Sequence, residues 1–147
     1  MSEHKATVNW KRDSATFDYE AYNREHVWAF PGGQALKASA APEFKGKPEC
    51  TNPEEALVAA IASCHMLTFL ALAARKGIVV DRYTDNAVGY LEKNGGGKLC
   101  VDRVVLRPQI VFGSNGLSGA DLTAFHHKAH QHCFIANSVL TKVDFQV

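Results

Sequence analysis

Two cysteines in different helical settings are the residues of this 147-residue chain most able to do chemistry. Cys64 lies within the apolar run LVAAIASCHMLTFLALAA, and Cys133 follows 69 positions later, at the end of the histidine-rich segment HHKAHQHC. A thiolate is a strong nucleophile, and a second thiol within reach can convert its oxidised form to a disulfide. The pair favours thiol redox chemistry, against the alternative that a free cysteine is simply a small buried hydrophobe.

The surroundings of Cys64 place a physical requirement on the rest of the chain. An apolar environment raises the pKa of a thiol, and a position in the middle of a helix gains nothing from the helix dipole. A reactive Cys64 therefore needs a cation brought from elsewhere. Arg24 is the first candidate, and Arg12 and Lys37 are the next; the alternative interpretation of each is an ordinary solvated charge.

Cys133 has a different setting, because the helical pattern breaks at His132 and then restarts. A sulfur near the start of the new helix would lie close to amide dipoles that favour a thiolate. The sequence therefore predicts Cys133 to be the resolving thiol.

The histidines near Cys133 raise a competing hypothesis of zinc binding. His126, His130 and Cys133 are spaced four and three residues apart, so one helix face can carry all three, with Cys64 or His65 as a fourth ligand. The four histidines between positions 126 and 132 cannot all face one site, and solvated helical histidines explain most of them. We expect no bound metal and no cofactor, and metal analysis of the purified protein tests the zinc alternative.

Strands are expected on both sides of the apolar helix that carries Cys64. Alternating apolar residues and turn signals predict strands in residues 5–11, 15–22, 26–30 and 35–40 before it, and in residues 78–83, 86–94, 98–112 and 141–147 after it. Pro108 belongs at a strand edge or a bulge. This order predicts one α+β domain over residues 1–147, with antiparallel sheets packed on helices.

Capping residues mark the boundaries of the two predicted helices. Asn52 can cap the first helix, with Pro53 at its first position and Glu55 three residues after the cap, and Gly77 ends it. A second helix is expected from Ser118 to about residue 132, followed by a short helical turn.

The first helix is also the candidate for a membrane span, because residues 56–74 are apolar and long enough to cross one. It contains polar residues and its neighbours are amphipathic strands, so we expect no membrane and a central helix covered on most sides by protein.

Composition narrows the choice of partners and compartment. The chain has 16 Lys and Arg against 15 Asp and Glu, and no basic face indicates a nucleic-acid partner. Its N-terminal sequence lacks the apolar segment of a secretory signal, so we expect thiols in a reducing cytoplasm. Cys50 and Cys100 have no assigned role.

The run NPEEALVAAIASCH, followed by AHQHCFIANS, resembles the OsmC/Ohr family of osmotically inducible and organic hydroperoxide resistance proteins. The family pattern has an NPE helix start, a reactive cysteine after it and a second cysteine near a late helix, which correspond here to Glu54, Cys64 and Cys133. The order of elements agrees along the whole chain. The resemblance implies an OsmC-like fold around a long central helix, an intertwined homodimer, and an antioxidant, peroxiredoxin-like activity in the oxidative stress response.

The implied activity is a thiol peroxidase that reduces organic hydroperoxides. Cys64 would become a sulfenic acid that condenses with Cys133, and a cytosolic dithiol, in some relatives a lipoyl group, would reopen the disulfide. Arg24 would stabilise the thiolate, while Glu54 would hold the arginine. The alternative from another class is a module that binds a small apolar or thiol-bearing molecule without turnover.

Glu54 and Cys64 cannot touch within one straight helix, because ten residues rise about 15 Å. An antiparallel crossing of this helix with its copy in a two-fold dimer would bring Glu54 of one chain towards Cys64 of the other. The sequence therefore suggests an active site that draws on both chains.

Overall fold

The computed structural model describes residues 1–147 and divides the chain into two compact units, Met1–Ala56 and Leu57–Val147. The first unit is an antiparallel sheet in the order β1 (Thr7–Asn9), β2 (His26–Ala29) and β3 (Ala35–Ala38), followed by the short helix η1 (Pro42–Phe44). The strands expected within residues 5–11, 26–30 and 35–40 are confirmed.

The strand expected over residues 15–22 is wrong, because this segment is irregular. The carboxylate of Asp18 accepts the backbone N–H groups of Glu20 and Ala21, which holds a turn where a strand would need an extended chain. Phe17 belongs to a local aromatic cluster instead, in which it packs against Trp10 and Tyr22.

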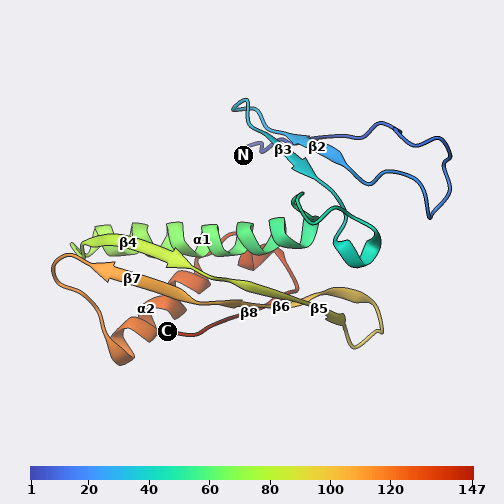
Figure 1. Cartoon of the computed structure of the whole chain (residues 1–147). Coiled ribbons are helices and arrows are strands. Elements are labelled where there is room, and N and C mark those ends of the chain that lie inside the picture. The colour runs from blue at the N-terminus through green and yellow to red at the C-terminus, as the bar shows by residue number, and fades with distance from the viewer. The chain divides into compact units, whose positions relative to one another are not determined.

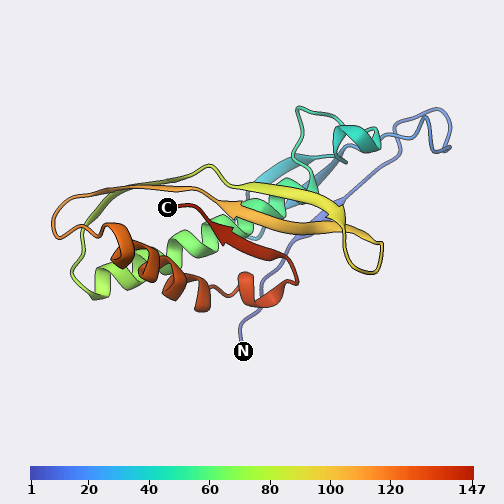
Figure 2. The same cartoon turned by 90° about the horizontal axis from the view of Figure 1, so that it is seen from below.

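The second unit contains two sheets and two helices (Figure 1). One sheet pairs β4 (Val80–Asp85) with β7 (Pro108–Phe112), and the other has the order β5 (Val88–Lys93), β6 (Leu99–Leu106) and β8 (Lys142–Phe145). Figure 2 shows that α1 (Pro53–Arg75) and α2 (Gly119–Gln131) lie on the same side of the β4–β7 pair.

Strand pairing in this unit is antiparallel, as expected, except that β8 pairs with β6 in parallel. The long connection through α2 and the short helix η2 (Ala136–Ser138) allows the chain to return to β6 in the same direction. Pro108 begins β7, which has a partner on one side alone, so its missing N–H leaves no gap in a central strand.

The predicted helix boundaries are confirmed. The N–H of Glu55 donates to Oδ1 of Asn52 at 2.8 Å, and the N–H of Asn52 donates to the Glu55 carboxylate at 3.0 Å, which is a reciprocal capping box. Gly77, with φ of 69°, follows the end of α1. Ser118 occupies the cap position of α2 without a side-chain hydrogen bond.

The core of the second unit lies against one stripe of α1. The fully buried residues of α1 recur every four positions and are Ile61, His65, Phe69 and Ala73. Phe69 and Ala73 pack with Phe125 and Ala129 of α2, whereas Ile61 packs against β6.

The remaining surface of α1 is uncovered, contrary to the expectation that protein covers this helix on most sides. Its most apolar 18-residue window has a mean hydropathy of 2.1, but only 22% of that window is buried. By length and composition alone, α1 could also cross a membrane, a property it shares with the core helices of soluble proteins. Within one chain, α1 packs against a core along one face, although its sequence is apolar on nearly every face. The exposed small and apolar residues are Ala59, Ala60, Ser63, Leu67, Ala71 and Ala74.

Candidate functional site

The structure brings Cys64 of α1 against Cys133, which follows the end of α2. The N–H of Ile135 donates to Sγ of Cys64 at 3.5 Å, and the next amide, that of Ala136, donates to Sγ of Cys133 at 3.5 Å. Both thiols are free and in contact. Two consecutive backbone amides therefore donate hydrogen bonds to two neighbouring sulfurs. The sequence did not predict this feature, because it depends on how the turn after α2 folds back onto α1.

The two thiols differ in burial. Cys133 is 0% exposed, whereas Cys64 is half-buried. Burial first, and contact with the Cys64 thiol second, raise the pKa of Cys133 to about 11. The expectation that a helix start would favour a Cys133 thiolate is wrong. The hydrogen bond from the amide of Ala136 lowers the pKa of Cys133, but burial raises it by more.

Two histidines, one of which directly follows Cys64 in the chain, form a buried pair. His65 and His126 are 1% and 0% exposed, and Nε2 of His65 lies 2.9 Å from Nδ1 of His126. Burial is the main reason that the pKa of each falls to about 4, so both rings are neutral at pH 7. The outward nitrogens, Nδ1 of His65 and Nε2 of His126, are buried without a hydrogen-bond partner.

This pairing bears on the zinc hypothesis, which placed His126, His130 and Cys133 around one ion with Cys64 or His65. No group of three or more His, Cys, Asp and Glu side chains in the chain is arranged to hold a metal ion. Nδ1 of His126, which could have served as a ligand atom, bonds to the other histidine instead.

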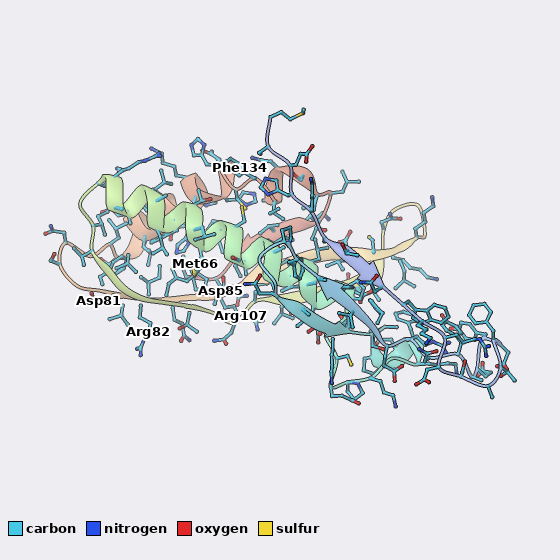
Figure 3. The ribbon with its side chains drawn as sticks, turned by 90° about the horizontal axis from the view of Figure 1, so that it is seen from above. Met66, Asp81, Arg82, Asp85, Arg107 and Phe134 are labelled. Carbon is cyan, nitrogen blue, oxygen red and sulfur yellow. The ribbon has the colours of Figure 1, made fainter.

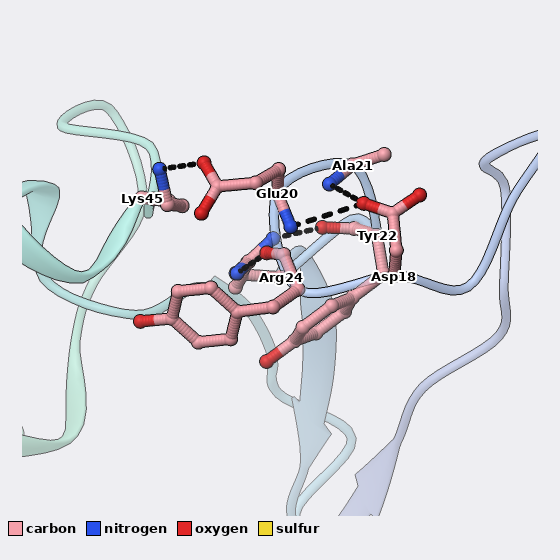
Figure 4. Close-up of polar contacts among 7 residues, drawn as sticks. Asp18, Glu20, Ala21, Tyr22, Arg24 and Lys45 are labelled. Atoms are coloured by element: carbon pink, nitrogen blue, oxygen red, sulfur yellow. Dashed lines mark hydrogen bonds and ion pairs between the residues drawn. The ribbon is translucent and has the colours of Figure 1, made fainter.

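Arg24, the first candidate for the activating cation, is enclosed by its own loop in the first unit (Figure 4). Its side chain is 8% exposed and donates to the backbone carbonyls of Tyr19 and Tyr22. The guanidinium carbon also lies 3.7 Å from the centre of the Tyr22 ring. Arg24 and Cys64 belong to different units, so a role of Arg24 at Cys64 stays a prediction.

The backbone of Arg24 is fixed by a histidine that the sequence did not single out. Nε1–H of Trp28 donates to Nε2 of His26 at 2.9 Å, which leaves the proton of this imidazole on Nδ1. Nδ1–H of His26 therefore donates to the carbonyl of Arg24 at 2.8 Å. Both nitrogens of His26 are thus satisfied.

Glu54 and the alternative cations have no catalytic partner within the first unit. Glu54 and Arg24 form no ion pair in this chain, and Oε2 of Glu54 is buried without a hydrogen-bond partner. Arg12 donates to the carbonyls of Ser14 and Ala15. Arg12, Lys37 and Cys50 line a cavity of about 590 Å³ in this unit.

The surface next to the two thiols is apolar. Phe134, labelled in Figure 3, directly follows Cys133 and is 81% exposed. Leu67 is exposed on α1 one turn after Cys64, and Met66 is half-buried. Organic molecules would contact this surface more favourably than small polar ones.

Asp85 is a half-buried carboxylate at the end of β4. The N–H of Arg107 donates to Oδ1 of Asp85 at 2.7 Å, which ties the break between β6 and β7 to the end of β4 (Figure 3). Burial raises the pKa of Asp85, and burial together with the charge of Asp85 raises the pKa of Tyr83. No sequence pattern signalled this contact.

Comparisons with known proteins concern the family and the fold of this chain. The model of a family described as OsmC-like protein matches residues 46–147. A solved OsmC-like protein of unknown function from Vibrio cholerae is 49% identical, covers 99% of each chain and has a TM-score of 0.93. The uncharacterised protein YmaD of Bacillus subtilis is 26% identical over 129 residues, 85% of each chain. The fold is shared with an organic hydroperoxide resistance protein from Legionella pneumophila, at 21% identity, coverage of 99% and 96%, and a TM-score of 0.68.

Proposed function

The chain belongs to the family of OsmC-like proteins, and on this premise we propose that it is a thiol peroxidase that reduces organic hydroperoxides. The resemblance seen in residues 52–65 and at Cys133 is thereby confirmed. Proteins named for organic hydroperoxide resistance share the fold. The observation that supports the proposal most is the contact between Cys64 and Cys133, with an amide N–H directed at each sulfur.

The first proposed step is attack of the Cys64 thiolate on a peroxide oxygen. An S–O bond forms and the O–O bond breaks, so the sulfur is oxidised by two electrons to a sulfenic acid and the leaving alkoxide takes a proton to become an alcohol. The N–H of Ile135, 3.5 Å from the sulfur, stabilises its negative charge before attack.

The second proposed step closes a disulfide. Cys133 loses its proton and attacks the sulfenic sulfur, the S–S bond forms, and the S–O bond breaks with release of water. A dithiol from a reducing cytoplasm then exchanges with this disulfide and becomes oxidised in its place. Because the pKa of Cys133 is raised to about 11, the thiolate needed for this step is scarce at neutral pH and increases as the pH rises.

The proposal includes a homodimer, because α1 leaves an apolar surface uncovered. The exposed residues centred on Ser63 and Leu67 run along the helix, and a second copy would bury them in a self-complementary contact. Such a crossing would also bring Glu54 of the second copy, whose Oε2 has no partner here, towards Cys64. Arg24 would then bridge the Glu54 carboxylate and the thiolate.

One equivalent of cumene hydroperoxide tests the chemistry directly. In a Cys50→Ser/Cys100→Ser background, intact-mass measurement should show loss of two hydrogens and digestion should locate a Cys64–Cys133 disulfide. Dithiothreitol or dihydrolipoamide should then be consumed over many turnovers. Formation of no disulfide, with no dithiol consumption, would leave the non-catalytic binding module as the better account.

A mixed dimer tests the shared site separately. A Cys64→Ser chain paired with a Glu54→Gln chain would contain one intact site if each site uses both chains, and would keep about half of the wild-type activity per dimer, by the two-fold symmetry of the contact. If Glu54 serves its own chain, neither site is intact and the mixed dimer should be no more active than its parents.

A further inference from the structure

We infer that the hydrogen bond between His65 and His126 fixes the register of α2 on α1, and thereby holds the Cys64 and Cys133 sulfurs opposite each other. The two histidines are then positioning residues for disulfide closure and do not touch the substrate. This inference deepens the proposed function and rests on it, because it takes Cys64 and Cys133 as the redox pair.

The geometry of the pair is that of a directional hydrogen bond. The two ring planes differ by 4°, and their centroids are 5.3 Å apart. Parallel rings stacked face to face cannot bring two nitrogens much closer than about 3.5 Å, the van der Waals separation. The Nε2···Nδ1 distance of 2.9 Å therefore means that the rings meet edge to edge, with the N–H of one pointing at the lone pair of the other.

This bond is the one hydrogen bond between a side chain of α1 and a side chain of α2. The rest of their interface is apolar and includes Phe69, Ala73 and Phe125. Apolar contacts have no preferred direction and tolerate sliding, whereas a buried polar group that loses its partner costs about 1–3 kcal/mol. A slip of α2 by one turn, about 5.4 Å, would leave both imidazoles unpaired.

The pair is joined to both thiols by short stretches of helical chain. His65 directly follows Cys64 on α1. Cys133 follows His126 by seven residues, close to two helical turns, and its N–H still bonds to the carbonyl of His130. A disulfide requires Cα atoms about 4.4–6.8 Å apart, so a one-turn slip would remove the thiols from bonding range.

Aromatic side chains hold the histidine pair in place. The ring centroid of Phe69 is 4.6 Å from that of His126, and Phe145 lies 5.6 Å from His126 and 5.9 Å from His65. These contacts limit rotation of both imidazoles, so the hydrogen bond can transmit the position of one helix to the other.

The test is the equilibrium between the Cys64–Cys133 disulfide and dithiothreitol, measured by alkylation and intact mass in the Cys50→Ser/Cys100→Ser background. His126→Leu and His126→Asn are a matched pair of similar size, of which asparagine keeps a polar atom near the position of Nδ1. We expect leucine to lower the effective concentration of the two thiols by tenfold or more, a rise of about 30 mV in reduction potential. Asparagine should stay within about threefold of the wild type. The control Lys128→Gln, at an exposed position of α2, should match the wild type.

Folding is controlled with a second variant and an independent measurement. His65→Leu/His126→Leu leaves no unpaired imidazole, so it keeps the test available if His126→Leu does not fold, and circular dichroism checks every variant. A purely structural role would destabilise the oxidised and reduced forms alike and leave the potential unchanged. Folded leucine variants with the wild-type potential would therefore overturn the inference. A wild-type protein that forms no Cys64–Cys133 disulfide would refute the proposed function itself.

Discussion

The two cysteine sulfurs accept similar hydrogen bonds but differ in their exposure to solvent. Cys64 is half-buried on a helix with much of its surface uncovered, whereas Cys133 is fully buried where the chain leaves α2. Each sulfur accepts one backbone N–H at the same distance of 3.5 Å. Burial, and not the number of donors, therefore separates the accessible sulfur from the one that remains protonated.

Serine substitutions test this division most strongly. Cys64→Ser should lower peroxide-dependent dithiol consumption by roughly a thousandfold or more, because a serine hydroxyl does not ionise near neutral pH. Cys133→Ser should react once and stall as a sulfenic acid on Cys64, which dimedone trapping and mass spectrometry would detect. Equal loss of the first turnover in both variants would contradict the assignment.

Acid tests how much the buried pair of His65 and His126 makes the stability of the protein depend on pH. The pKa values of His65 and His126 are about 4 in the folded protein, and the ordinary value is 6.5, so the unfolded chain binds more protons between these pH values. The free energy of unfolding should fall as the pH drops from 6.5 to 4, by about 1.4 kcal/mol per pH unit for each imidazole that stays neutral. Urea unfolding of the wild type over this pH range measures the loss.

The control for the acid effect is the His65→Leu/His126→Leu variant. Its curve of unfolding free energy against pH should be flatter than that of the wild type in the same window. Parallel curves would show that other groups, such as buried carboxylates, cause the acid sensitivity.

The pH dependence of disulfide closure sharpens the contrast between the thiols. Because the pKa of Cys133 is raised to about 11, its thiolate fraction grows about tenfold per pH unit throughout the neutral range. Closure, followed by the decay of the sulfenic acid in single-turnover experiments, should accelerate by about a hundredfold over two pH units. A plateau near neutral pH would mean that Cys133 ionises more easily than its burial implies.

The smallest expected effect concerns the cation. Arg24→Lys should slow the peroxide step and the alkylation of Cys64 by iodoacetamide about tenfold, because an ammonium is a point charge where a guanidinium can bridge a thiolate and a carboxylate. Disulfide closure should not change, since Cys133 does the attacking there. Arg82→Lys, at an exposed arginine outside the candidate set, is the matched control. Thermal unfolding reports any loss of the Arg24 bonds to Tyr19 and Tyr22. Unchanged alkylation in Arg24→Lys would move the search to Arg12 and Lys37.

Local signals in the sequence predicted much of the fold. The capping box of Asn52 and Glu55 and the glycine after α1 involve neighbours in the chain, so their physics can be read from a short segment. The turn at residues 94–97 between β5 and β6 is likewise local. The strand predicted over residues 15–22 was wrong, because the alternation of apolar residues does not reveal that the Asp18 carboxylate stabilises a turn.

The candidate site could be predicted in part. Its two cysteines were identified from their residue type and from the resemblance to a family, and the structure places them in contact. The roles of Arg24 and Glu54 remain predictions, because both residues belong to the first unit and the two thiols belong to the second. The amides of Ile135 and Ala136 gave no signal, because any residue but proline carries an N–H.

The sequence by itself determined where the helices begin and end, which residues could react, and the family to which the chain belongs. Tertiary structure decided how those residues behave. It made Cys133 a poorly ionised thiol through burial and paired His126 with His65 by a hydrogen bond. It also joined β8 to β6 in parallel. The physical reason is that caps and turns depend on residues a few positions apart, whereas burial, pKa and the pairing of distant groups depend on which segments pack together.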